Sequence, residues 1–84
     1  MDQVDYAILF FLKNKPAVTK LSAVSRKTIH AAVDAAVRLD TLYRRLKAIV
    51  EAGYAAKGAK DRREHTYYIT EKGEKALEEA VNEE

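Results

Sequence analysis

The sequence predicts a mainly α-helical fold with one small β-hairpin, in the order three helices, hairpin, final helix. Three observations support this prediction. Apolar residues recur at helical spacing over much of residues 3–52, the period changes to about two after Gly53, and the helical period returns after Thr70. With 84 residues, of which 48% are apolar, residues 1–84 are expected to form a single domain.

The first predicted helix runs from Gln3 to Lys13, between a candidate N-cap at Asp2 and a stop at Pro16. Its main apolar stripe comprises Val4, Ala7, Ile8, Phe11 and Leu12. Outside that stripe lie Tyr6, Leu9 and Phe10. A helix that is apolar most of the way round must be covered on more than one side. We expect the second cover to come from another subunit or, alternatively, from a loop or the C-terminal helix.

Residues 17–39 are predicted to contain a second helix from Arg26 to Val37. Its apolar residues at helical spacing are Ile29, Ala32, Val33, Ala36 and Val37. Ser25 is a candidate N-cap, and Thr19 is an alternative that would start the helix earlier. His30 stands alone in this segment, so we expect it to be a structural residue and not a ligand.

A third helix is predicted from Thr41 to Ala52, with Asp40 as its N-cap and Gly53 as the left-handed residue that ends it. Its buried stripe is expected to be Leu42, Leu46, Ile49 and Val50. The arc left outside that stripe carries Thr41, Arg44, Arg45 and Lys47, with Tyr43 at its edge. Two helices joined by a tight turn, the second cationic on its outward face, suggest a helix-turn-helix that reads the major groove of DNA.

The segment after Gly53 is predicted to form a hairpin, with strands at residues 54–57 and 66–69. Its tip, at residues 60–65, has no apolar side chain and suits contact with phosphates or with a minor groove. Thr70 is the expected N-cap of the last helix. The narrow apolar stripe of that helix comprises Ala76, Leu77, Ala80 and Val81.

Charge is distributed unevenly along the chain, although the net charge is only +2. Residues 13–63 carry thirteen Lys and Arg against four Asp and Glu, a net charge of +9, whereas residues 1–12 carry −2 and residues 64–84 carry −5. A basic centre between acidic ends is typical of a polyanion-binding surface, and scattered solvated charge is the alternative. The lysines expected to contact phosphates are Lys13, Lys15, Lys20 and Lys27.

Several classes of function are not expected from these residues. The chain has no Cys, two distant His and no glycine-rich phosphate loop, so we expect no enzyme, no cofactor and no metal site. The apolar run YAILFFL, residues 6–12, is far shorter than the about 20 residues that a membrane-spanning helix needs. We therefore expect no membrane partner and a cytoplasmic, nucleoid-associated protein.

Two segments, TLYRRLKAIVEAGY at residues 41–54 and TYYITEKGEKAL at residues 66–77, resemble winged helix-turn-helix regulators. The resemblance is greatest to the PadR-like group, with MarR-like relatives next. It implies three helices, a wing and a C-terminal helix, with the helix at residues 41–52 in the major groove and the wing at residues 54–69. The DNA-binding residues that the resemblance implies are Thr41, Tyr43, Arg44, Arg45, Lys47, Lys60, Arg62 and Arg63.

The sequence thus predicts a small transcriptional regulator that binds double-stranded DNA. It is expected to be a homodimer formed through the helix at residues 3–13 and the C-terminal helix. Two alternatives share the same basic surface: a winged-helix module for protein or RNA contact, and a non-specific architectural DNA binder.

Overall fold

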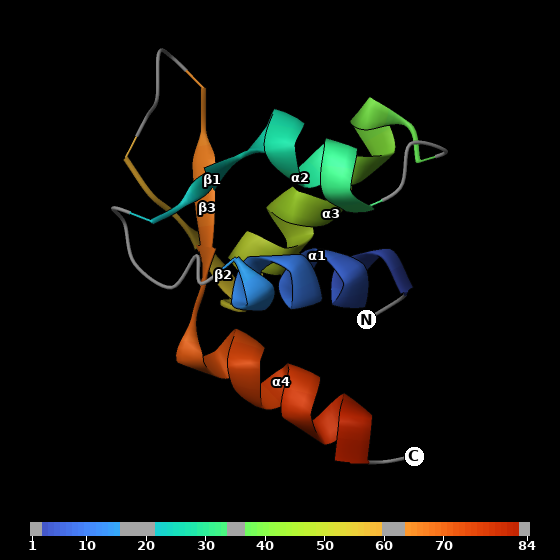
Figure 1. The fold of residues 1–84 in the computed structure, drawn as a ribbon, viewed down its shortest axis with the longest axis vertical. Coiled ribbons are helices and arrows are strands. Elements are labelled where there is room, and N and C mark those ends of the chain that lie inside the picture. Colours follow the sequence, from blue (N-terminus) through green and yellow to red (C-terminus); the bar gives the residue numbers. More distant parts are fainter. Residues whose placement is uncertain (1–2, 16–21, 34–36, 60–63, 83–84) are drawn as a thin grey trace.

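The computed structural model describes residues 3–15, 22–33, 37–59 and 64–82. Its elements in chain order are α1 (Gln3–Asn14), β1 (Val24–Ser25), α2 (Arg26–Val33), α3 (Leu39–Glu51), β2 (Ala55–Lys57), β3 (Thr66–Ile69) and α4 (Glu71–Asn82). In Figure 1, α1 lies between the α2–α3 pair and α4, and the sheet stands beside the helices. Four helices and a small sheet confirm the predicted fold class.

The core is centred on α1, which contacts the three other helices and β3. The buried apolar residues of α1 and α2 are Ile8, Leu9, Leu12 and Ile29, and α3 adds Leu42, Leu46 and Ile49. From the sheet and α4 come Ala55, Tyr67, Ile69 and Leu77. Burial of each large side chain contributes about 1.5–3 kcal/mol. Three members of the stripe predicted for α3, Leu42, Leu46 and Ile49, are buried as expected, whereas the fourth, Val50, is only half-buried against the core.

The cover of α1 comes largely from the chain itself. Leu9, which lies outside the main apolar stripe, is fully buried, and Tyr6 is half-buried against the core. Phe10 is different, because 61% of its surface is exposed. Packing of α4 against α1 supplies one of the two sources of cover expected from the sequence.

The sheet has three antiparallel strands in the order β1-β3-β2, where the sequence predicted only the β2–β3 hairpin. In the hairpin, Ala55 lies opposite Ile69 and Lys57 opposite Tyr67. The additional strand, β1, has only two residues, which is too short for an alternating pattern to be recognised. Its pairing with β3 ties the start of α2 to the hairpin.

The connection between α2 and α3 differs from the prediction at both ends. Helix α2 ends at Val33, and Val37 is not helical. The carbonyl of Val37 accepts a hydrogen bond from Nε2 of His30 at 2.7 Å. This contact confirms a structural role for His30. Helix α3 begins at Leu39 with Arg38 as its N-cap, so the prediction that Asp40 caps the helix was wrong.

Asp40 lies instead in the first turn of α3, where its Oδ1 accepts from the backbone N–H of Thr41 at 3.0 Å. A carboxylate in the first turn of a helix still interacts favourably with the free amides and with the positive end of the helix dipole. Ser25 does act as expected for α2, because its Oγ accepts from the N–H of Thr28 at 3.3 Å.

The end of α3 and the start of α4 are joined through a turn at Gly53. This residue has φ of 87°, the left-handed conformation predicted for it. The hydroxyl of Thr70 donates to the Gly53 carbonyl at 2.6 Å and accepts from the Gly73 N–H at 3.2 Å, which confirms Thr70 as a cap. Nζ of Lys72 donates to the Ala52 carbonyl at 2.8 Å. The start of α4 therefore holds the last turn of α3 in place.

The predicted N-cap Asp2 and the alternative helix start at Thr19 lie outside the described residues. No helix within the described ranges is long and apolar enough to cross a bilayer.

Candidate nucleic-acid interface

The outward face of α3 is the first component of the candidate interface. Leu42, Leu46 and Ile49 bind the helix to the core, and this leaves Arg44 and Lys47 exposed on the other side. Both positions lie one helical turn apart, so their side chains point into the same space. Thr41 is half-buried at the start of the helix.

A groove of about 490 Å³ separates this face of α3 from the wing, defined here as residues 54–69. Its Arg, Lys, Glu and His lining residues are Arg26, Arg44, Lys47, Glu51, Lys57 and His65. Four of these always carry a positive charge at neutral pH and only one carries a negative charge. The groove therefore has the electrostatic character of a site for a polyanion.

Arg26 is held at the edge of this groove by an aromatic ring. Its Cζ lies 4.0 Å from the centre of the Tyr43 ring, within the distance of a cation–π contact. Tyr67, which also lines the groove, is only 6% exposed. Burial raises the pKa of the Tyr67 phenol above 10.0; the positive charge of Arg26 partly offsets this, and the neighbouring Tyr43 adds to it. Arg26, Tyr43 and Tyr67 thus form one packed group.

Arg45 does not share the groove with Arg44. Its Nε donates to Oδ1 of Asp5 at 2.9 Å, and its Nη2 donates to Oδ2 of the same carboxylate. The Asp5 side chain is 3% exposed and that of Arg45 34% exposed. The guanidinium thus faces α1, which corrects the expectation that Arg45 lies on the outward arc of α3.

The remaining predicted residues are divided between the groove and the undescribed tip of the wing. Tyr43 lines the groove and is half-buried. The three wing residues lie outside the described part of the chain: Lys60, Arg62 and Arg63. The Arg, Lys, Glu and His residues of the groove that sequence reasoning did not assign are Arg26, Glu51, Lys57 and His65. Lys57, as the last residue of β2, could have been found from its place at the base of the predicted wing.

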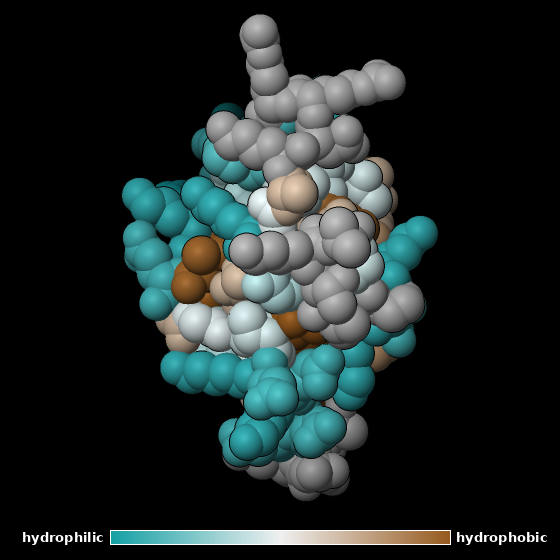
Figure 2. Space-filling view, turned by 90° about the vertical axis from the view of Figure 1, so that its left-hand side faces the viewer, coloured by the Kyte–Doolittle hydropathy of each residue, from teal (hydrophilic) through white to brown (hydrophobic). Residues whose placement is uncertain are grey.

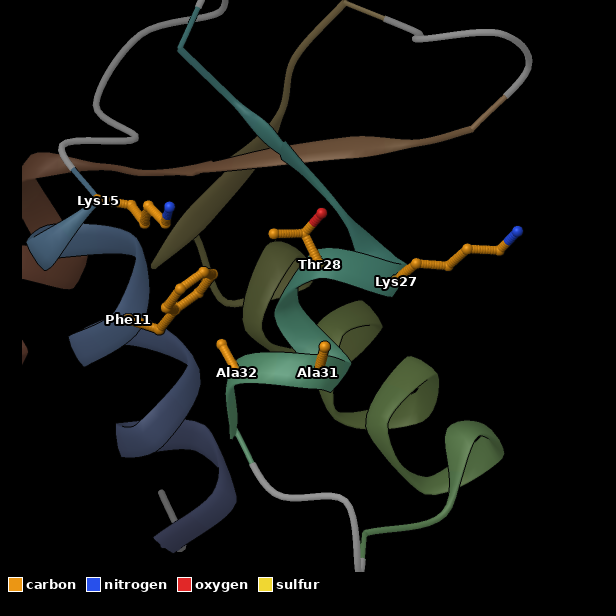
Figure 3. A pocket seen from close by; sticks show the side chains of 6 residues that line it. All are labelled: Phe11, Lys15, Lys27, Thr28, Ala31 and Ala32. Carbon is orange, nitrogen blue, oxygen red and sulfur yellow. The ribbon is translucent and has the colours of Figure 1, made fainter.

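Two of the lysines expected to contact phosphates line a different hollow, between α1 and α2. Figure 3 shows Lys15, which directly follows α1, and Lys27 of α2 on either side of it, with Phe11, Ala31 and Ala32 between them. Nζ of Lys27 lies 3.6 Å from Oε1 of Glu64. This hollow is separate from the α3–wing groove, because the two have no lining residue in common.

Most of the coloured surface in Figure 2 is hydrophilic, and its apolar areas are small and separate. The lower part of that view, where α4 lies, is hydrophilic; exposed glutamates of this helix include Glu71, Glu78 and Glu79. An acidic helix of this kind would repel DNA, so α4 is not part of the candidate interface. Within the described residues, no group of three or more His, Asp and Glu is placed to hold a metal ion.

No protein-family model and no curated protein matches the sequence. Solved structures do match the fold. TubR from Bacillus megaterium pBM400 superposes with a TM-score of 0.84 at 20% identity, over 96% of this chain and 87% of that one.

Two further structures are similar. The DNA-binding TubR fragment from Clostridium botulinum has a TM-score of 0.72 and 25% identity, over 95% of this chain and 96% of the fragment. SSV1 F-93 has a TM-score of 0.68 and 20% identity, over 98% of this chain and 89% of that one. The architecture and these likenesses together show that the chain has the winged helix-turn-helix fold.

Proposed function

We propose that this protein binds double-stranded DNA as a small transcriptional regulator. The observation that supports the proposal best is the α3–wing groove, whose described lining contains four cations, Arg26, Arg44, Lys47 and Lys57, and one acid, Glu51. The likeness to a DNA-binding TubR fragment of similar length agrees with it. We place the protein in the cytoplasm, associated with the nucleoid.

In this proposal α3 enters the major groove and the wing lies along the adjacent backbone or minor groove. Arg44 and Lys47 are the residues of α3 that reach the DNA, because both are exposed on the side of the helix away from the core. A bidentate contact from Arg44 to guanine would contribute about 1–3 kcal/mol of discrimination between bases. Lys60, Arg62 and Arg63 would contact the DNA from the tip of the wing.

We assign Arg45 to folding and not to DNA contact. Its guanidinium binds a carboxylate that is almost fully buried in α1, 40 positions earlier in the chain. Releasing Arg45 to a phosphate would leave that carboxylate buried without its guanidinium partner, which is costly. Among winged-helix regulators, the segments at residues 41–54 and 66–77 favour kinship with the PadR-like group, and MarR-like proteins come next.

We also propose that the protein acts as a homodimer through α1 and α4. Phe10 supports this, because it is a large aromatic side chain on α1 with 61% of its surface exposed, and a second subunit would remove that surface from water. A dimer of winged helices would bind two half-sites related by two-fold symmetry, about one helical turn apart.

The direct test is a salt titration of duplex binding for three single variants, each of which removes one positive charge. Arg44→Ala and Lys47→Ala alter the groove, and Lys75→Ala is the matched control on the exposed surface of α4. Each groove variant that removes one phosphate contact should make the slope of log affinity against log salt shallower by about 0.9. A groove variant that removes a base contact should instead weaken binding to one sequence more than to others. Lys75→Ala should match the parent.

Equal behaviour of all three variants would refute the assignment of the groove. Selection of bound oligonucleotides from a random pool then separates the remaining possibilities. A two-fold symmetric motif is expected for a dimeric regulator. Salt-dependent binding without any enriched motif would indicate a non-specific architectural role, and no duplex binding at all would favour the protein or RNA module.

A further inference from the structure

Within the described residues, Nε of Arg26 is the buried side-chain nitrogen that lacks a hydrogen-bond partner. Arg26 itself is half-buried, and its Nε is inaccessible to solvent. A buried donor without an acceptor costs free energy, and such a group in a folded protein calls for an explanation, such as local strain, a functional role or a bound water or ion. The described residues provide no carboxylate within ion-pair distance of its guanidinium.

The surroundings of Arg26 increase this cost. Arg44, Lys47 and Lys57 line the same groove, so the guanidinium shares it with three other cations. Among the described residues that line the groove, Glu51 alone opposes them. Repulsion among these cations is relieved when an anion enters, and the groove is open enough for one, at about 490 Å³.

The Tyr43 ring determines how Arg26 can meet such an anion. A guanidinium whose Cζ lies 4.0 Å from a ring centre is supported on one face, which leaves its planar edge of N–H donors available to a ligand. That edge matches two oxygens of a phosphate in a bidentate arrangement. A small turn of the guanidinium on the ring would also give Nε the acceptor that it lacks.

We propose that Arg26 and Tyr43 form a two-residue receptor for a DNA phosphodiester, with Tyr43 as the supporting platform and not itself a base contact. This rests on the proposed function, and it changes the role of Tyr43. Arg26 lies at the start of α2, whose preceding strand β1 pairs with β3. The receptor therefore joins the helix-turn-helix to the wing and fixes where the backbone lies between them.

The experiment is a double-mutant cycle on duplex binding, using two unrelated duplexes of about 20 base pairs. Arg26→Ala should make the salt slope shallower by about 0.9, so that the affinity lost between 50 and 200 mM salt is about 3.5-fold smaller than in the parent. The effect should be equal on both duplexes, because a phosphate contact carries no base information. Lys75→Ala is again the matched control.

The Tyr43 variants separate the platform from a hydroxyl contact. Tyr43→Phe keeps the ring and should bind as the parent does. Tyr43→Leu removes the ring and should lose affinity, and combining it with Arg26→Ala should cause little further loss. Thermal unfolding of each variant verifies that it is folded. If Tyr43→Phe weakens binding as much as Tyr43→Leu, the platform role is wrong.

A direct readout is the ¹⁵N resonance of Arg26 Nε, which should move when DNA is added. Inorganic phosphate at the same ionic strength should move it far less; an equal shift with phosphate and none with DNA would overturn the assignment to a phosphodiester. If Arg26→Ala keeps the parent's slope of log affinity against log salt, while Arg44→Ala and Lys47→Ala have shallower slopes, the receptor is refuted and DNA binding stands. If the parent shows no salt-dependent binding, both proposals fail.

Discussion

Replacing Gly73 with Ala tests the way α4 is attached to the rest of the fold. A Cβ at this position would lie 2.1 Å from the carbonyl oxygen of Tyr54 and 2.9 Å from Cγ1 of Ile69. The first of these atoms belongs to the backbone, and the Tyr54 carbonyl also accepts from the N–H of Thr70 at 3.2 Å. The clash therefore cannot be relieved by turning a flexible side chain.

The size of the effect follows from two opposing contributions. An ordinary carbon–oxygen contact needs about 3.3 Å, so α4 must move by roughly 1 Å. Such overpacking typically costs about 1–3 kcal/mol or more, and the movement also draws Leu77, which is 6% exposed, away from the core. Alanine gains about 1 kcal/mol over glycine inside a helix. Because the obstacle is backbone, we take the upper part of that range and expect a net loss of about 2 kcal/mol in the free energy of unfolding.

The measurement is thermal unfolding followed by circular dichroism, with urea unfolding as a second determination. For a domain of this size, about 2 kcal/mol corresponds to a fall in Tm of roughly 8–16 °C. Lys75→Ala, on the exposed surface of the same helix, is the control and should change the free energy by less than about 0.5 kcal/mol. A Gly73→Ala variant with an unchanged or higher Tm would show that helix propensity outweighs the contact, and the reasoning would be wrong.

Two further predictions concern ionisable groups in the fold. Arg45→Met should lower the free energy of unfolding by about 3–5 kcal/mol in urea titrations, because it removes the guanidinium from a carboxylate that is 3% exposed. The double change Asp5→Leu with Arg45→Met should recover most of that loss and keep full DNA affinity; a loss of affinity there would restore Arg45 as a DNA contact. Tyr67 should make the parent less stable as pH rises through 10.0, since its raised pKa means that the unfolded chain releases the phenolic proton first. Tyr67→Phe should remove that part of the pH dependence. If the free energy of unfolding changes with pH equally in the two proteins between about pH 9 and 11, the prediction is contradicted.

Periodicity in the sequence determined the elements whose stabilising pattern is local. Of the stripe predicted for α3, Leu42, Leu46 and Ile49 are buried and Val50 is half-buried, and the strand at Thr66–Ile69 has the predicted limits. Gly53 ends α3 through its left-handed backbone conformation, and Thr70 caps the start of α4 through a hydrogen bond. Each of these effects involves only a few neighbouring residues. Such features can be predicted because a helix or a hairpin repeats its geometry along the chain.

Tertiary structure alone decided which charged side chains face the candidate interface. Arg44 and Arg45 are adjacent in the sequence and both lie outside the leucine stripe, yet only Arg44 lines the groove, because a buried Asp5 40 positions away binds Arg45. Arg26 reaches the same groove because α2 crosses close to α3 and its ring partner is Tyr43. The sequence by itself showed that a cationic helix exists. The pairing of charges across the fold depends on distances between segments that are remote in the chain, and it decided which cations of that helix face the candidate interface.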